Sequence, residues 1–131
     1  MPVAQDLVIF TQTYDLLTWL LPQCERFPKS QRFVVTQRLM AAALDFQGAI
    51  FEANARSGAH RLQHLHAADA HLNKLRLYLR LSNRWAWLST GQYEHVSRIV
   101  AGIGKLLGGW IKQTRAADAA GAARRGDAGD A

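Results

Sequence analysis

The sequence has few of the residues that break helices or cross-link small proteins. Its three prolines are Pro2, Pro22 and Pro28, so no proline interrupts the chain from Lys29 onward. The single cysteine, Cys24, has no partner for an internal disulfide and none at a metal-binding spacing. We therefore expect long helices and a fold that depends on its hydrophobic core. The length of 131 residues suffices for one such domain.

Long apolar runs are absent as well. No stretch approaches the roughly 18 consecutive apolar residues that a membrane-spanning helix needs. The first residues, from Met1 to Asp6, lack the basic start and the apolar segment of a secretory signal. Apolar residues make up 49% of the chain and charged residues 20%, as in an ordinary globular domain. We expect a cytoplasmic protein that makes no contact with a membrane.

Negative charge is scarce relative to positive charge. Sixteen lysines and arginines stand against ten aspartates and glutamates, which gives a net charge of +6 and an isoelectric point near 10.1. Residues 116–131 hold two arginines against three aspartates, so residues 1–115 carry +7. A body with this charge attracts a polyanion such as nucleic acid, or an acidic face of a partner protein. The alternative is a domain whose positive charge has no role in binding a partner.

Hydrophobic periodicity predicts four helices and indicates no strand or internal repeat. The predicted helices span residues 5–21, 30–54, 59–83 and 89–113. Pro22 is expected to end the first helix, Ser30 to cap the second, and Gly58 to adopt a left-handed cap after it. Ser89 and Gln92 fit a capping box at the start of the fourth helix.

Short connections between these helices make neighbours antiparallel. The predicted fold is therefore all-α, an up-down-up-down four-helix bundle formed by residues 1–114. Residues 115–131 are rich in Ala, Gly, Asp and Arg and contain no large apolar side chain. They cannot bury enough surface to offset the entropy of ordering, so we expect a disordered tail.

Two of the predicted helices have two apolar faces, whereas a helix in a small monomeric bundle needs only one. In the third helix the predicted core face consists of Leu65, Ala68, Leu72, Leu75 and Leu79. A second apolar sector includes Leu77, Tyr78, Leu81 and Trp85. In the first helix, Ile9, Leu16 and Leu20 lie opposite Leu7, Tyr14 and Leu21. Spare apolar faces usually mark an interface, so we expect a homo-oligomer that uses the second sector of the third helix. The alternative is a thick core that is reached from two sides.

Two rows of basic residues lie on the third and fourth helices. The first, the arginine row, consists of Arg76, Arg80 and Arg84. The second, the outer basic row, consists of Arg98, Lys105 and Lys112 and lies opposite the apolar arc of the fourth helix. The simplest interpretation is that both rows lie on helix faces exposed to solvent and bind nothing. However, Glu94 is the only acidic residue of the fourth helix, so we expect both rows to contact a polyanion or another partner.

Catalytic and metal-binding patterns are weak. Four histidines fall between His60 and His71, and His60 and His64 are four residues apart, but no carboxylate joins them on their face. The sequence contains no phosphate-binding loop, nucleophile elbow or acid pair at catalytic spacing. Trp85 and Trp87 suit either stacking on a base or packing at the end of the bundle. We expect a protein with no metal, no cofactor and no enzymatic activity.

Three segments carry a resemblance to a known family. The first is Phe27-Pro28-Lys29-Ser30-Gln31-Arg32-Phe33 followed by Gln37-Arg38, and the second is the stretch from Leu75 to Leu81. The third combines Leu88-Ser89, Gln92-Tyr93-Glu94-His95 and the stretch from Ile103 to Lys112. Together they resemble the accessory variability determinant proteins of diversity-generating retroelements. Those are similar in turn to the four-helix proteins encoded in intervening sequences of 23S ribosomal RNA genes.

The resemblance implies a basic, barrel-shaped homopentamer. It also implies binding to the element's reverse transcriptase and to its template RNA, with DNA or an RNA–DNA hybrid as alternative ligands, in support of mutagenic cDNA synthesis. The arginine row falls where the family's third helix carries basic residues. Two other functions stay open: a protein of a ribosomal RNA intervening sequence, and a structural oligomer that binds only protein. The histidine stretch and the segment after Arg115 are not features of the family.

Overall fold

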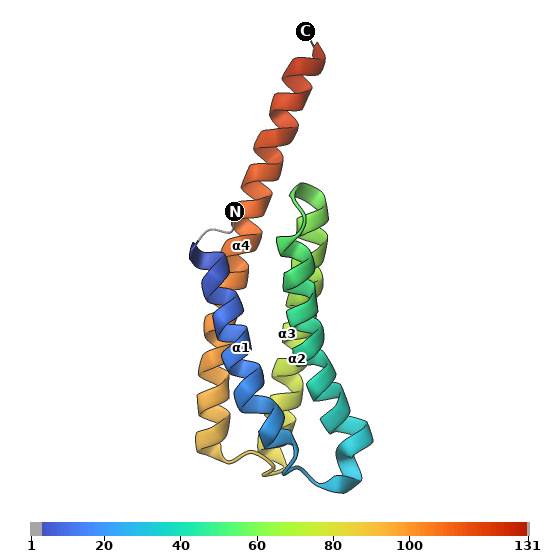
Figure 1. Cartoon of the computed structure of the whole chain (residues 1–131), viewed down its shortest axis with the longest axis vertical. Helices are drawn as coiled ribbons and strands as arrows, with labels where there is room; N and C mark the ends of the chain where they lie inside the picture. The colour runs from blue at the N-terminus through green and yellow to red at the C-terminus, as the bar shows by residue number, and fades with distance from the viewer. Residues whose placement is uncertain (1–3, 131) are drawn as a thin grey trace.

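The chain folds into four helices that run alternately along one long axis (Figure 1). A computed structural model describes residues 4–130, with side chains described for residues 8–126. The helices are α1 (Ala4–Cys24), α2 (Gln37–Asn54), α3 (Gly58–Arg84) and α4 (Thr90–Asp130). The described residues form no strand, so the predicted all-α four-helix bundle is confirmed.

Each helix packs against two neighbours, but not equally. The contact between α2 and α3 is the most extensive, followed by α3 with α4 and α1 with α4. The contact between α1 and α2 is the smallest of the four. One edge of the bundle is therefore more open than the other three.

The core is built mainly from leucines, isoleucines and alanines of all four helices. The predicted core residues of α3, from Leu65 to Leu79, are all buried. On α4 the predicted arc is confirmed, with Val96, Val100, Ile103, Leu107 and Trp110 buried and Tyr93, Ile99 and Leu106 packed against them. On α1 the buried face is that of Ile9, Leu16 and Leu20. Tyr14 of the opposite face is 64% exposed, and the side chain of Leu7 lies outside those described.

The first helix continues past Pro22 and ends at Cys24, where the sequence predicts an end at the proline. Proline removes one backbone hydrogen bond inside a helix, a loss that packing can offset near a helix end. Here Leu20 and Cys24 lie on the same side of the last turns and are both buried. Burial of these side chains is what keeps the last turn helical.

The start of the second helical segment is irregular. A 3₁₀ turn, Lys29–Gln31, is followed by a π-helical turn, Arg32–Thr36, before α2 begins at Gln37. Ser30 lies inside the 3₁₀ turn and caps neither turn, because no side-chain cap hydrogen bond is formed at the start of either. The single predicted helix of residues 30–54 is therefore three consecutive segments of different pitch.

The two remaining connections follow the predicted local chemistry closely. The backbone N–H of Gln92 donates to Ser89 Oγ at 3.1 Å, and the backbone N–H of Ser89 donates to Gln92 Oε1 at 2.9 Å, which completes the predicted capping box. Gly58 has a positive φ of 58°, as expected, but it is the first residue of α3 and not a cap on α2. Ala86, between α3 and α4, also has a positive φ, at 61°.

The fourth helix extends well beyond the other three (Figure 1). Residues 115–130, predicted to be disordered, continue α4 as regular helix. Alanine has the highest intrinsic helix propensity, and this stretch is alanine-rich. The first turns of the extension also contact the body: Asp118 Oδ1 lies over Gly58, 3.2 Å from the position of a Cβ there. The helix propensity of alanine and this contact together explain why residues 115–130 are helical, although the segment has no large apolar side chain.

Candidate nucleic-acid interface

Helices α3 and α4 enclose a groove that brings part of the arginine row against small side chains of α4. The groove has a volume of about 440 Å³. It is lined on the α3 side by Arg76, Leu77 and Arg80, and on the α4 side by Tyr93, Ser97 and Ala101. Arg76 and Arg80 come from successive turns of α3, so both guanidinium groups border the same groove.

Arg76 lies directly across the α3–α4 contact. Its guanidinium group covers Gly104, where a Cβ would overlap it. The same guanidinium donates to Asn73 Oδ1 at 2.8 Å, one turn earlier on α3. The absence of a side chain at Gly104 is therefore what lets the arginine lie along α4 while its outer edge faces solvent.

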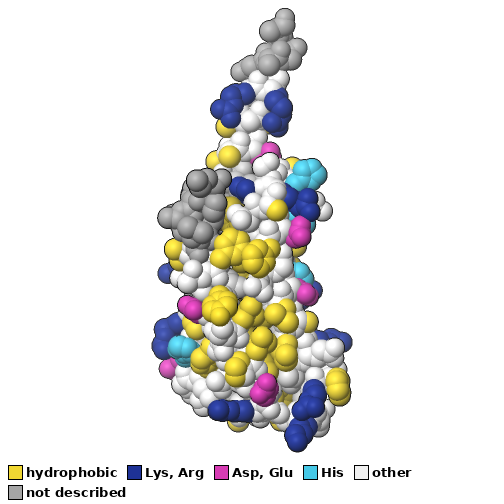
Figure 2. Space-filling view, viewed as in Figure 1, with side chains coloured by type: hydrophobic (Ala, Val, Ile, Leu, Met, Phe, Trp, Pro, Cys, Tyr) yellow, Lys and Arg dark blue, Asp and Glu magenta, His cyan; other side chains and the backbone are white. Residues whose placement is uncertain are grey.

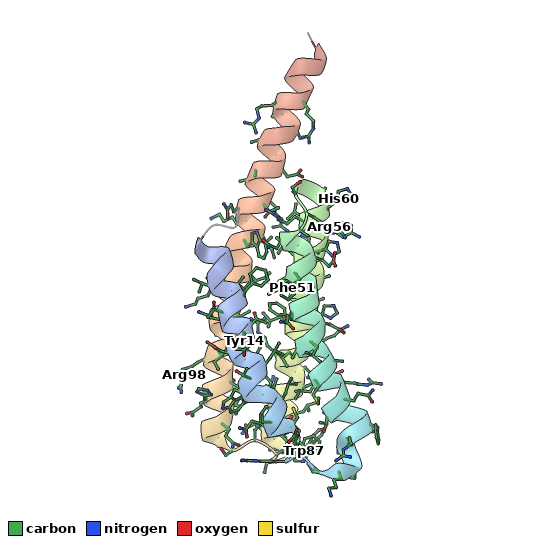
Figure 3. All side chains as sticks on the ribbon, in the orientation of Figure 1. Tyr14, Phe51, Arg56, His60, Trp87 and Arg98 are labelled. Carbon is green, nitrogen blue, oxygen red and sulfur yellow. The ribbon has the colours of Figure 1, made fainter. Side chains whose placement is uncertain are left out.

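The outer basic row occupies the side of α4 that faces away from the bundle. Arg98, Lys105 and Lys112 are all exposed, and Figure 3 shows Arg98 directed outward from α4. Gly108 and Gly109 beside this row are exposed, with open space where a Cβ would stand. Gly102 differs from them, because it faces Gln12 of α1 with Oε1 3.1 Å from a Cβ position. The row is thus open to a partner along one flank and bordered by α1 on the other.

None of these six basic side chains is neutralised within the described chain. Among the described residues, the ion pair that forms joins Arg56 to Glu52 at 2.8 Å, at the C-terminal end of α2. Arg76, Arg80, Arg84, Arg98, Lys105 and Lys112 make no ion pair with a described carboxylate. Exposed cations in rows with no counter-charge produce a positive potential along α3 and α4. A polyanion is the class of ligand that such a surface attracts most strongly.

Aromatic residues cluster at the end of the bundle beside Arg84. Trp85 and Trp87 have ring centroids 5.0 Å apart, and Trp87 in turn packs against the buried Phe27 at 5.4 Å. This arrangement supports packing at the bundle end as the role of Trp87. Trp85 remains about half exposed at the C-terminus of α3, next to the last member of the arginine row.

The predicted oligomer interface on α3 divides into two parts. Leu77 and Trp85 are about half exposed, whereas Tyr78 and Leu81 are partly buried. Tyr78 packs against the core of its own bundle. The spare apolar sector of α3 is therefore narrower than the sequence suggests, and its accessible members are Leu77 and Trp85.

A larger apolar surface covers the open edge between α1 and α2, and the sequence predicts only its Tyr14 side as a spare apolar face. Its exposed members are Tyr14 on α1 and Phe33, Leu44 and Phe51 on the α2 side. We call these four residues the α1–α2 apolar band. Figure 2 shows hydrophobic side chains gathered over this face, and Figure 3 shows Tyr14 and Phe51 on its two sides. The spacing of eleven and seven residues from Phe33 through Leu44 to Phe51 is visible in the sequence, but spacing alone does not reveal that this face is exposed.

The histidines do not come together as a metal site. The described residues contain no group of three or more histidine, cysteine, aspartate or glutamate side chains placed to hold an ion. His66 Nε2 lies 3.4 Å from an Arg115 nitrogen, and His95 packs against Trp19 at 5.2 Å. Burial raises the pKa of the Cys24 thiol to about 12, which keeps it protonated and unreactive at neutral pH.

Fold and surface together define a class of protein: a basic, all-α four-helix bundle with long unpaired rows of cations and exposed apolar faces. The chain belongs to the bAvd-like family, the accessory variability determinant proteins of diversity-generating retroelements. The family model matches residues 7–114. This confirms the resemblance drawn from the sequence and makes the chain an accessory protein of a retroelement at the level of its family.

A solved structure shares the fold. It is a protein of unknown function from the S23 ribosomal protein family of Bacteroides thetaiotaomicron, with a TM-score of 0.76 and 23% sequence identity. The similarity covers 82% of this chain and 98% of that one. No curated protein sequence matches the chain significantly. Within residues 4–130 no helix has both the length and the apolar character needed to span a membrane.

Proposed function

We propose that the protein is a non-catalytic accessory subunit of a diversity-generating retroelement that binds the reverse transcriptase and the template RNA. The family supports the accessory role. The observation that carries RNA binding is the pair of basic rows on α3 and α4, whose six exposed cations have no described counter-charge. Phosphate contacts of this kind give affinity without sequence preference, which suits a subunit that holds a template for a polymerase.

The groove between α3 and α4 is the centre of the proposed RNA contact. Arg76 and Arg80 line its border, and the Arg76 guanidinium lies over Gly104 and is positioned by its hydrogen bond to Asn73. Positioned guanidinium groups lose less conformational freedom on binding phosphate than free ones do. Arg84, which is exposed, extends the contact toward the end of the bundle.

The test is RNA affinity as a function of salt, measured with the template RNA of the same element. The variant Arg76→Gln/Arg80→Gln/Arg84→Gln should bind more weakly, and the slope of log affinity against log salt should fall by about 2 in magnitude, since each single-stranded phosphate contact contributes about 0.7. The matched control Arg26→Gln/Arg38→Gln/Arg124→Gln removes three exposed arginines elsewhere and should keep the slope. Equal slopes in the two variants would show that the arginine row is not the contact.

Self-association is part of the same proposal. The exposed apolar side chains of Leu77 and Trp85 on α3 exceed what an isolated bundle needs, and the family resemblance implies a homopentamer. Native mass spectrometry at micromolar concentration should give one oligomeric mass. The variant Leu77→Ser/Trp85→Ser should reduce that mass if α3 supplies the interface. A monomeric wild-type protein would refute self-association.

A further inference from the structure

A second groove lies at the corner where α1 ends and α2 begins, away from the basic rows. Its volume is about 710 Å³, within the range of ligand-binding clefts. The residues that matter for its chemistry are Cys24, Phe27, Phe33, Thr36, Met40 and Leu44. We call this cleft the Thr36 groove. Phe33 forms its rim and is 80% exposed, the highest value among the large apolar side chains described.

Thr36 has a buried hydroxyl that lacks a hydrogen-bond partner. Its side chain is 5% exposed, and Oγ1 has no donor or acceptor within reach. The other three buried hydroxyls described, those of Thr13, Ser82 and Thr114, each donate to the carbonyl four residues earlier at 2.7 to 2.8 Å. Thr36 ends the π-helical turn, which shifts the carbonyls out of that register. A buried polar group without a partner is rare, and here it belongs to a residue that lines a cleft.

The surroundings of the groove specify the chemistry of an occupant. Residues 25–38 carry Arg26, Lys29, Arg32 and Arg38 against the single carboxylate of Glu25, and all five side chains are exposed. The groove continues into the α1–α2 apolar band. Its members Phe33, in the π-helical turn, and Leu44 and Phe51, in α2, lie eleven and seven residues apart, a span of about 25 Å. The described residues offer no strand edge for pairing with an extended peptide. Along the band the charge is mixed, since Asp15, Asp45 and Glu52 are exposed there. An amphipathic helix of about 17 residues with its acidic side chains at the groove end matches this length, apolar stripe and charge.

We propose that the Thr36 groove and the α1–α2 apolar band bind an acidic amphipathic helix of a protein partner, with one large apolar side chain inserted beside Phe33. A hydroxyl on the inserted side chain would meet the unpaired Oγ1 of Thr36. This surface is separate from the arginine row, so one copy of the protein can hold RNA and a protein helix at once. The identification of that partner as the reverse transcriptase rests on the proposed function.

A synthetic peptide tests the groove without reference to the retroelement. The probe is a fluorescein-labelled helical peptide with leucines and one phenylalanine on one face and glutamates on the other, and anisotropy measures its affinity. Phe33→Ser should weaken binding about tenfold, as expected for a central apolar anchor. Val8→Ser, which also removes an exposed apolar side chain but lies outside the groove and the band, should leave it unchanged. Equal binding of a peptide with lysines in place of the glutamates would overturn the proposal.

The hydroxyl of Thr36 has its own test. A peptide with tyrosine in place of the phenylalanine should bind wild type about threefold more tightly, and this advantage should vanish on Thr36→Val. Thr36→Val should fold with an unchanged or higher melting temperature, because it removes a buried unpaired hydroxyl. An equal tyrosine advantage on both proteins would show that Thr36 takes no part.

The reverse transcriptase and the oligomer complete the set of outcomes. If the wild-type protein binds the peptide but not the reverse transcriptase, the groove stands and the proposed function fails. If Phe33→Ser weakens binding of the peptide and of the reverse transcriptase but keeps RNA affinity and oligomeric mass, both proposals are supported. If Phe33→Ser lowers the oligomeric mass, a second copy of the chain occupies the groove. If RNA competes with the peptide, the two surfaces are not separate. A lowered oligomeric mass for Phe33→Ser or competition by RNA would each overturn the inference.

Discussion

Replacing Gly58 with alanine should destabilise the bundle, and the size of the loss reports on how the extension of α4 is held. Gly58 begins α3 with a φ of 58°, a conformation that costs an alanine roughly 1–2 kcal/mol. The lower entropy of the unfolded alanine chain offsets about 0.4–1 kcal/mol of that. An added methyl group would also lie 3.2 Å from Asp118 Oδ1 on the extension, closer than an ordinary contact. We expect the free energy of unfolding to fall by about 1–2 kcal/mol and the melting temperature by about 3–8 °C.

Urea unfolding followed by far-UV circular dichroism measures this loss. Gly48→Ala is the matched control, because Gly48 lies inside α2 with open space around it and should gain about 0.5–1 kcal/mol. The double variant Gly58→Ala/Asp118→Ala should recover part of the loss, since removing the carboxylate frees room for the methyl group. A neutral or stabilising Gly58→Ala would refute the positive-φ argument. Strictly additive effects of the two substitutions would show that α4 does not rest on the α2–α3 turn.

Three further predictions concern single residues in the connections and the core. Ala86→Gly should raise the free energy of unfolding by up to about 1 kcal/mol, because Ala86 has a φ of 61°; a loss of stability in urea unfolding would contradict this. Ser89→Ala should cost about 1 kcal/mol by removing the 3.1 Å bond that caps α4, and Thr90→Ala, outside the capping box, serves as its control. Cys24 should make stability fall as the pH rises from 9 toward 12, because burial raises the pKa of the folded thiol from 9.0 to about 12 while the unfolded thiol ionises first. Thermal melts of Cys24→Ala over the same range should lack that component, and identical pH dependence of the two proteins would rule it out.

Helix caps and the core faces of single helices are the features of the fold that the sequence predicts best. The capping box at Ser89 and Gln92 involves residues three apart, and its geometry follows from the start of any helix. The core faces of α3 and α4 are marked by leucines and other large residues at helical spacing, so periodicity located them correctly.

The buried face of α2 could not be recognised from large apolar residues. Four of its seven buried residues are alanines, which contribute little to a search for large apolar side chains; the face consists of Leu39, Ala42, Ala43, Phe46, Ala49, Ile50 and Ala53. Small side chains let α2 approach α3 closely, and this is the most extensive helix contact of the bundle. The large side chains of Leu44 and Phe51 in α2, and of Phe33 in the preceding π-helical turn, lie on the exposed face.

The candidate site was accessible only in part. Periodicity placed the arginine row and the outer basic row on one face of each helix, and those side chains are exposed as expected. The groove between α3 and α4, the contact of Arg76 with Gly104, and the unpaired hydroxyl of Thr36 depend on how two segments meet. Spacing within one segment contains no information about such contacts.

The contact between Arg76 and Gly104 links two positions that are far apart in the chain. A side chain at position 104 would displace the guanidinium from the surface of α4, so the pose of the arginine is encoded on the opposite helix. Natural variation at the two positions should therefore be correlated. Relatives with a larger residue at the position of Gly104 should replace the arginine or direct it away from the groove, and relatives that keep the arginine in this pose should keep the glycine.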